Sequence, residues 1–145
     1  MIQDQERRFV EFTDETGVAT NGLVALAMAG RAKPMAAAAV AERAGSDPDY
    51  THQALLRLER AGLVEADAAQ PGSFHLSRPP SEVSLLDVAQ AMGEPFRVHC
   101  CLNGRAVGDA SCEGCSLRPV CMELRGDVVS LFRSRSIGDL VGTRV

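Results

Sequence analysis

One stretch in the first half of the chain restricts the fold most, because it carries stop and start signals for two consecutive helices. Small apolar residues over positions 35–44 predict a short helix, and Gly45 ends it. Either Ser46 or Asp47 supplies the N-cap of the next helix. Pro48 fits the first turn of that helix, where its missing N–H costs little. The spacing therefore predicts two helices joined by a tight turn.

The second of these helices has an apolar face and is followed by a hairpin. Its apolar residues recur at helical spacing: Ala54, Leu55, Leu58 and Ala61. Gly62 ends the helix, and strands over 63–66 and 73–76 flank a turn at 69–72. This order is typical of a winged helix-turn-helix, whose second helix enters the major groove of DNA while the hairpin touches the backbone. Winged helices also serve as protein-interaction modules, so that reading stays open.

Helices are also expected on both sides of this motif. An apolar run within residues 1–30 predicts a helix that ends at Gly30, and Ser84 caps a further helix over 85–92. A last helix carries an apolar stripe: Leu117, Val120, Cys121, Leu124, Val128, Leu131 and Phe132. Because a stripe on a peripheral helix needs a partner, we expect a homodimer. The fold is thus mostly α with a small β-hairpin wing.

We expect three segments along the chain. Residues 1–93 form the winged helix-turn-helix DNA-binding domain. Residues 94–115 form a cysteine-rich loop, for which a metal-cluster site is argued below, and residues 116–145 form the dimerisation helix and tail.

All five cysteines lie within residues 100–121, and the first 99 residues contain none. In a reducing compartment such a cluster ligates metal or senses redox state more often than it forms structural disulfides. The pair Cys112-x2-Cys115 is the strongest local signal, since this spacing lets both sulfur atoms reach one metal centre. Thiolates suit an iron–sulfur cluster or tetrahedral zinc.

Charge and composition limit the function. The net charge is −4, so DNA binding has to come from a local arrangement of arginines. The segment from Ser46 to Arg78 contains three arginines and five acidic residues, so its own net charge is negative. No apolar run is long enough to span a membrane and the acidic N-terminus is unlike a signal peptide, which predicts a cytoplasmic protein. No catalytic triad, P-loop or carboxylate pair is evident, so we do not expect an enzyme.

Four segments resemble one family of bacterial regulators: residues 50–64 (YTHQALLRLERAGLV), 76–88 (LSRPPSEVSLLDV), 115–120 (CSLRPV) and 136–141 (SIGDLV). The chain is similar to the Rrf-two family, which includes the IscR and NsrR types, over nearly its whole length from Phe12. The resemblance implies a dimeric winged-helix regulator that binds promoter DNA. Many members hold an iron–sulfur cluster through three cysteines between their last two long helices, and cluster loss, oxidation or nitrosylation changes their DNA affinity.

The resemblance also suggests ligands. Cys115 falls at the family's third cysteine, and Val98-His99-Cys100 is similar to the family's Val-Asp-Cys, which favours Cys100 as the first. With Cys112 these form the expected ligand set for a 2Fe-2S or 4Fe-4S cluster. The alternatives are Cys101, Cys121, His99 and Asp14, the last because Phe12-Thr13-Asp14 resembles a subgroup's carboxylate ligand. The spacing departs from the family's usual Cys-x5-Cys-x5-Cys, which leaves zinc, or no cofactor, as alternatives.

The expected DNA-reading residues lie on the second helix of the motif. They are Tyr50, Thr51, His52, Gln53 and Arg57, with Arg78 on phosphate. Residues 68–72 at the wing tip carry no positive charge, although family wings are commonly basic there. This acidic reading surface motivates a second hypothesis, in which the chain is a thiol switch or a zinc-stabilised interaction module with weak or no DNA binding.

Overall fold

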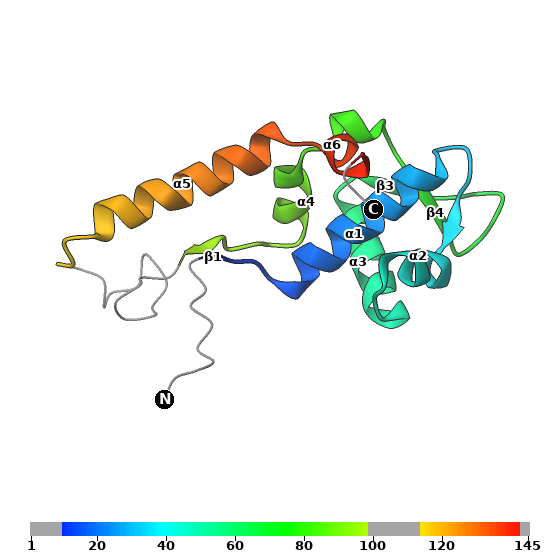
Figure 1. Cartoon of the computed structure of the whole chain (residues 1–145). Helices are drawn as coiled ribbons and strands as arrows, with labels where there is room; N and C mark the ends of the chain where they lie inside the picture. Colours follow the sequence, from blue (N-terminus) through cyan, green and yellow to red (C-terminus); the bar gives the residue numbers. More distant parts are fainter. Residues whose placement is uncertain (1–9, 99–113, 143–145) are drawn as a thin grey trace. The chain divides into compact units, whose positions relative to one another are not determined.

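The computed structural model describes residues 10–98 and 114–142. These divide into two compact units, one of Thr13–Glu94 with Phe132–Val145 and the other of Met1–Phe12 with Pro95–Leu131, which we describe separately. The elements labelled in Figure 1 are, in chain order, β1 (Val10–Glu11), α1 (Asp14–Ala29), β2 (Met35–Ala36), α2 (Ala37–Ala44), α3 (Pro48–Arg60), β3 (Val64–Ala66), β4 (Ser73–Leu76), the 3₁₀ helix η1 (Pro80–Glu82), α4 (Leu85–Ala91), β5 (Arg97–Val98), α5 (Arg118–Ser134) and α6 (Ile137–Val141). Within the described ranges, no helix combines the length and apolar content that a membrane crossing requires.

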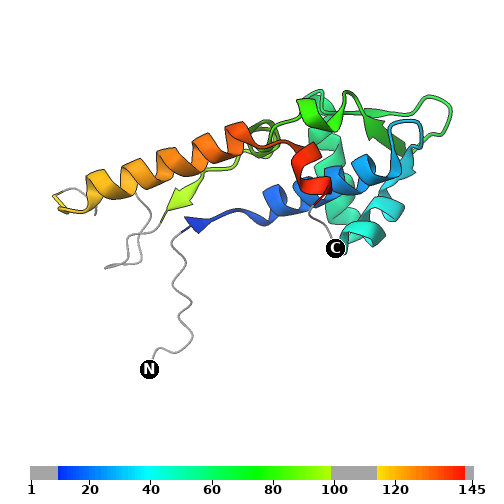
Figure 2. The same ribbon diagram turned by 45° about the horizontal axis from the view of Figure 1, so that its top comes forward.

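The helix-turn-helix forms where the sequence predicts it. Gly45 adopts φ 72°, and its N–H bonds to carbonyls of the last turn of α2, which ends the helix. Asp47 is the N-cap of α3: its Oδ2 accepts the Tyr50 N–H at 3.0 Å, and Pro48 is the first helical residue. Both α2 and α3 pack against α1, and Figure 2 shows the three helices grouped together.

The wing is a three-stranded antiparallel sheet in the order β2-β4-β3. Strands β3 and β4 form the predicted hairpin, with Glu65 opposite His75. The turn between them is closed by Asp67, whose carboxylate accepts the N–H groups of Ala69 and Gln70. Strand β2 is an addition to the sequence prediction, which assigned Met35 to a helix; instead Met35 pairs with Phe74. The first helix of the motif therefore begins only at Ala37.

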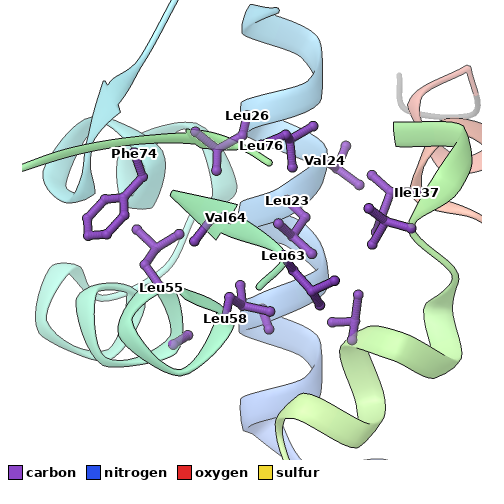
Figure 3. Packing of buried hydrophobic residues seen from close by; sticks show 14 of the residues in the cluster. Leu23, Val24, Leu26, Leu55, Leu58, Leu63, Val64, Phe74, Leu76 and Ile137 are labelled. Carbon is purple, nitrogen blue, oxygen red and sulfur yellow. The ribbon is translucent and has the colours of Figure 1, made fainter. Parts of the chain in front are cut away.

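The core of this unit joins all three helices to the wing and to α6. Leu23 of α1, Leu58 of α3 and Ile137 of α6 are each fully buried, and Figure 3 shows them packed with Leu55 and Val64. One predicted core position is wrong, since Ala61 is exposed. The reason is local, because α3 ends at Arg60 and the chain turns back at Gly62, so that Leu63 takes the buried place.

Helix α4 begins with a capping box. The Ser84 hydroxyl accepts the Asp87 N–H, and the Asp87 carboxylate accepts the Ser84 N–H. Helix α6 is attached beside it by two backbone hydrogen bonds, from Leu85 N–H to the Arg135 carbonyl and from Ile137 N–H to the Val83 carbonyl. The start of α6 is thereby fixed to the segment that leads into α4.

In the second unit, β1 pairs with β5, with Val10 opposite Val98. Phe96, just before β5, has a positive φ of 52°, and the Arg125 guanidinium donates to its carbonyl at 3.1 Å. Helix α5 confirms the predicted helix that carries the apolar stripe, although it is followed by the short α6 instead of only a tail, and none of its described residues is buried. Four residues of the predicted stripe are exposed: Leu117 39%, Val120 64%, Leu124 39% and Leu131 50%.

Candidate functional site

The exposed side of α3 is the candidate DNA-reading surface. Tyr50 and Gln53 are exposed and His52 is half-buried. The His52 ring packs edge-on against Phe74 of the wing, with ring centroids 6.2 Å apart. Tyr50, Gln53 and Arg57 follow one another at helical steps of three and four residues and therefore form a single stripe. The structure thus brings Tyr50, Gln53 and Arg57 onto one side of the helix, while His52 lies next to the wing.

Thr51 does not belong to this surface. Its side chain is 1% exposed, and its hydroxyl is the buried side-chain polar atom without a hydrogen-bond partner among the described residues. Helix geometry explains the position: Thr51 shares the inward face with Leu55 and Leu58, which lie four and seven residues further on. The expectation that its side chain reads DNA is incompatible with this burial.

The two arginines have different surroundings from Tyr50. Arg57 is half-buried, and a Cβ built on Gly93 would lie 3.7 Å from its Nη2. The guanidinium group therefore lies beside the corner that follows α4. Arg78 is also half-buried and follows β4, where the strand leaves the wing. Arg57 thus lies between the exposed stripe of α3 and this corner, whereas Arg78 belongs to the segment after the wing.

Tyr50 is held at both ends. Its backbone N–H is bound by the Asp47 cap, and its hydroxyl donates to Glu15 Oε1 at 3.2 Å. The pKa of Tyr50 is raised, first by partial desolvation of the phenol and then by the hydrogen bond to Glu15 and the negative charges of Glu15 and Asp14. The phenol is therefore held in its neutral, proton-donating form.

The wing is acidic. His75 Nε2 lies 3.3 Å from Glu65 Oε1, and His75 Nδ1 lies 3.7 Å from Asp67 Oδ1. Both ring nitrogens of His75 thus lie beside carboxylates of the wing and are not directed toward a DNA phosphate. Because residues 68–72 carry no cation, the wing offers no strong electrostatic anchor for a DNA backbone.

Only part of the predicted metal site is described. Cys115 and Cys121 are outside any disulfide, and each is half-buried. Cys115 lies three residues before the start of α5, and its carbonyl accepts the Arg118 N–H at 3.1 Å. Asp14 is exposed in the first turn of α1. The other expected ligands lie outside the described residues: Cys100, Cys101, Cys112 and His99.

Within residues 10–98 and 114–142, no three His, Cys, Asp or Glu side chains are grouped so as to hold a metal ion. The two described thiols are soft donors outside any disulfide, so in kind they fit iron–sulfur or zinc chemistry.

Sequence reasoning missed the contacts that two carboxylates make near the reading surface. Glu94 is 9% exposed and accepts hydrogen bonds from Thr13 and Thr16, which lie 81 and 78 residues away along the chain. Glu15 binds Tyr50 across 35 residues. Contacts of such separation leave no periodic or spacing signal in a single sequence. In the sequence, Gly93-Glu94-Pro95 indicates only the end of a helix.

This architecture defines a winged helix-turn-helix of the type that transcription regulators use to bind DNA. The Rrf2 family model, described as "Iron-dependent Transcriptional regulator", matches residues 12–143. The chain therefore belongs to the Rrf2 family. It is also 26% identical over 132 residues to "Putative HTH-type transcriptional regulator ORF2" of Azotobacter vinelandii, covering 91% of this chain and 79% of that protein. These relatives are regulators rather than enzymes.

Solved structures confirm the fold. The T. potens IscR structure matches with a TM-score of 0.69 and 17% identity, over 90% of this chain and 85% of that one. CymR (YrzC), "the Global Cysteine Regulator of B. subtilis", matches with a TM-score of 0.70 and 18% identity, over 92% of this chain and 97% of that one. The predicted mostly helical fold with a small wing is therefore confirmed.

Proposed function

We propose that this chain is a homodimeric regulator whose affinity for promoter DNA is switched by an iron–sulfur cluster bound to its cysteines. The observation that carries the proposal is that all five cysteines lie between residues 100 and 121, directly after a complete winged helix-turn-helix. Cysteines that only pack in a core would be scattered along the chain and not gathered in one segment. Regulation by redox state, nitric oxide or iron supply follows from the sensitivity of such clusters to these agents.

Three side chains on α3 are proposed for base contacts: Tyr50, His52 and Gln53. Gln53 is exposed and presents an amide that matches adenine in the major groove, and the other two flank it along the same helix. Arg57, for which the sequence predicts a base contact, is half-buried beside the corner after α4, so we propose a phosphate contact for it instead; Arg78 keeps its expected phosphate contact. Replacing Arg57 with Ala should therefore weaken binding to all duplexes by a similar factor. A loss confined to the operator duplex would instead assign Arg57 to a base.

For the cluster we propose Cys100, Cys112 and Cys115 as ligands, with Asp14 as the fourth and Cys101, Cys121 and His99 as alternatives. When bound, the cluster supplies a redox- and ligand-sensitive iron centre. The chain's own contribution to the switch is clearest at Cys115. This residue lies one turn before α5 begins, and its carbonyl accepts the N–H of Arg118, the first residue of that helix. A change in ligation at Cys115 therefore acts on the start of the proposed dimerisation helix.

Helix α5 is proposed as the dimer contact. Val120, Leu124 and Leu131 are 64%, 39% and 50% exposed along one stripe, and burying what remains exposed of each against a partner copy contributes about 1 kcal/mol. Replacing Leu124 with Glu should produce monomers in analytical ultracentrifugation. Ser130→Glu, on the opposite side of α5, is the matched control and should remain dimeric. Dimers in both variants would exclude this surface.

The cluster is tested by anaerobic purification with a visible spectrum and with iron and sulfide assays. A coloured protein with matched iron and sulfide supports the proposal, and single Cys→Ala changes at 100, 101, 112, 115 and 121 then identify the ligands. Promoter DNA from the region of its own gene provides the binding test, measured over a range of salt concentrations.

A second candidate is a zinc or thiol switch on the same fold, and one observation favours it. Glu65 and Asp67 occupy the wing beside His75, where a DNA-binding wing would carry cations. A colourless protein that takes up zinc, gains no cluster on reconstitution and shifts no promoter DNA would support this candidate.

A further inference from the structure

The first turn of α1 is bound from two sides. On one side lies Glu94, a carboxylate with 9% exposure at the corner after α4. Its Oε1 accepts the Thr13 backbone N–H at 2.9 Å, the Thr13 hydroxyl at 3.2 Å and the Thr16 hydroxyl at 2.6 Å. Three donors on one buried oxygen form a firm attachment, because a shift of the carboxylate would break all three hydrogen bonds together.

On its other side the same turn reaches the recognition helix. Glu15 lies between Thr13 and Thr16 in the sequence, and its Oε1 accepts the Tyr50 hydroxyl at 3.2 Å. A single helical turn cannot shift one of these residues without shifting the others. The contacts at Glu94 and at Tyr50 are therefore mechanically connected through four consecutive residues.

We propose that Glu94 and Glu15 form a relay that positions Tyr50, so that a corner far from the recognition helix in sequence determines how that helix reads DNA. This relay deepens the proposed function, on which it rests, by naming a means of regulation. Glu94 is the last residue of the DNA-binding unit before the chain continues to Pro95 and the cysteine segment. The relay thus begins where that segment joins the unit.

The chemistry of the Tyr50 hydroxyl gives the relay a consequence for specificity. A phenol that donates its proton to Glu15 has only oxygen lone pairs left for DNA. Lone pairs accept from the amino groups of adenine or cytosine and repel phosphate oxygens. With Glu15 in place Tyr50 therefore selects among bases, whereas a released Tyr50 would donate to any phosphate.

The chain supplies its own reporter for this contact. Tyr50 is the single tyrosine among the 145 residues, and there is no tryptophan, so near-ultraviolet-excited emission comes from Tyr50. A carboxylate that accepts the phenol proton quenches tyrosine emission. In the full chain without DNA, Glu15→Ala and Glu15→Gln should both raise this emission, since neither retains a carboxylate.

The relay itself is tested at its far end. Glu94→Ala should raise Tyr50 emission even though residue 94 does not touch Tyr50, and Glu94→Gln, which keeps an oxygen acceptor, should restore most of the quenching. Thr16→Val provides a second route if Glu94→Ala does not fold, as judged by circular dichroism. Unchanged emission in folded Thr16→Val and Glu94→Ala proteins, alongside increased emission in Glu15→Ala, would overturn the relay.

The DNA measurement separates positioning from charge. Operator duplex is obtained by selection from random duplexes with the wild-type chain, and a scrambled duplex is the comparison. Glu15→Ala should reduce the ratio of operator to scrambled affinity about fivefold, the factor that one ordinary hydrogen bond corresponds to. Glu15→Gln loses the same charge but keeps an acceptor, so it should retain the ratio.

A double variant completes the test. Tyr50→Phe should reduce the ratio as much as Glu15→Ala does, and combining the two changes should cause no further loss. Tighter binding of both duplexes by both Glu15 variants, with additive effects, would show that Glu15 acts only as a repelling charge and would overturn the proposal. If the wild-type chain binds neither duplex, the proposed function fails, while the emission results still decide the relay.

Discussion

The buried hydroxyl of Thr51 permits a sharp test of the position of α3. The side chain is 1% exposed and its Oγ1 has no partner in the described part of the chain, although sequence reasoning placed it on the DNA-reading side. Thr51→Val replaces this hydroxyl with a methyl group of similar size. The two roles predict opposite outcomes, since a reading residue would lose DNA affinity and a core residue would not.

The expected magnitude follows from the burial. An unpaired buried hydroxyl costs about 1–3 kcal/mol of desolvation, and valine removes that cost with nearly the same helix propensity and shape. We expect Thr51→Val to raise the free energy of unfolding by about 1 kcal/mol, or the Tm by about 4 °C. Thr51→Ser keeps the hydroxyl and deletes the methyl group, so it should lower stability by about 1 kcal/mol.

The assay is thermal and urea unfolding of the three proteins, with mobility shifts on one promoter duplex at fixed salt. Valine should stabilise the protein, serine should destabilise it, and neither should change DNA affinity by more than about twofold. A loss of stability in Thr51→Val would refute the reasoning, because it would mean that the hydroxyl is paired in the folded protein. A selective loss of DNA affinity at unchanged stability would return Thr51 to the reading surface.

Three further predictions rest on single contacts. Gly138→Ala should lower stability by about 1–3 kcal/mol in urea unfolding, because its Cβ would lie 3.2 Å from the Ser81 backbone nitrogen; Gly17→Ala, in an open part of α1, should raise it by about 0.5–1 kcal/mol. Asp47→Ala should cost about 1 kcal/mol through the lost cap, whereas Asp47→Asn keeps the cap and should equal the wild type in the same assay. In an ultraviolet titration of tyrosinate, the Tyr50 pKa should lie above its usual value near 10 and should fall in Glu15→Gln. Because the pKa in the folded protein is higher than in the unfolded chain, the neutral phenol contributes to folding stability below about pH 10. This contribution is lost as the pH rises through the folded-state pKa.

Local signals account for most of what the sequence predicted about the fold. Gly45, Asp47 and Pro48 act through their own backbone preferences, so the turn between α2 and α3 was predictable residue by residue. The addition of β2 was not, because a two-residue strand at Met35 depends on pairing with Phe74, 39 residues along the chain. Tertiary pairing there overrode a helical pattern.

The site was less predictable because helical phase decides accessibility. Tyr50, Thr51 and His52 are adjacent in sequence, and each has a polar group that could contact DNA. Successive residues are rotated by about 100° about the helix axis, however, and this rotation directs the Thr51 side chain into the core. Nothing in the types of these residues separates them. The Glu94 and Glu15 contacts were out of reach for another reason, since they join segments whose proximity only the fold creates.

The electrostatics of the reading surface explain why a positioned tyrosine matters in this protein. Five acidic residues oppose three arginines between Ser46 and Arg78, so counterion release contributes less to DNA affinity than in a basic reader. Asp47 also occupies the N-terminus of α3, where a phosphate would otherwise find free N–H groups. Affinity then depends on a few directional contacts, and each depends strongly on geometry. In such a surface a small displacement of Tyr50 changes selectivity by a larger factor than it would where phosphate attraction dominates, which makes the first turn of α1 an effective point of control.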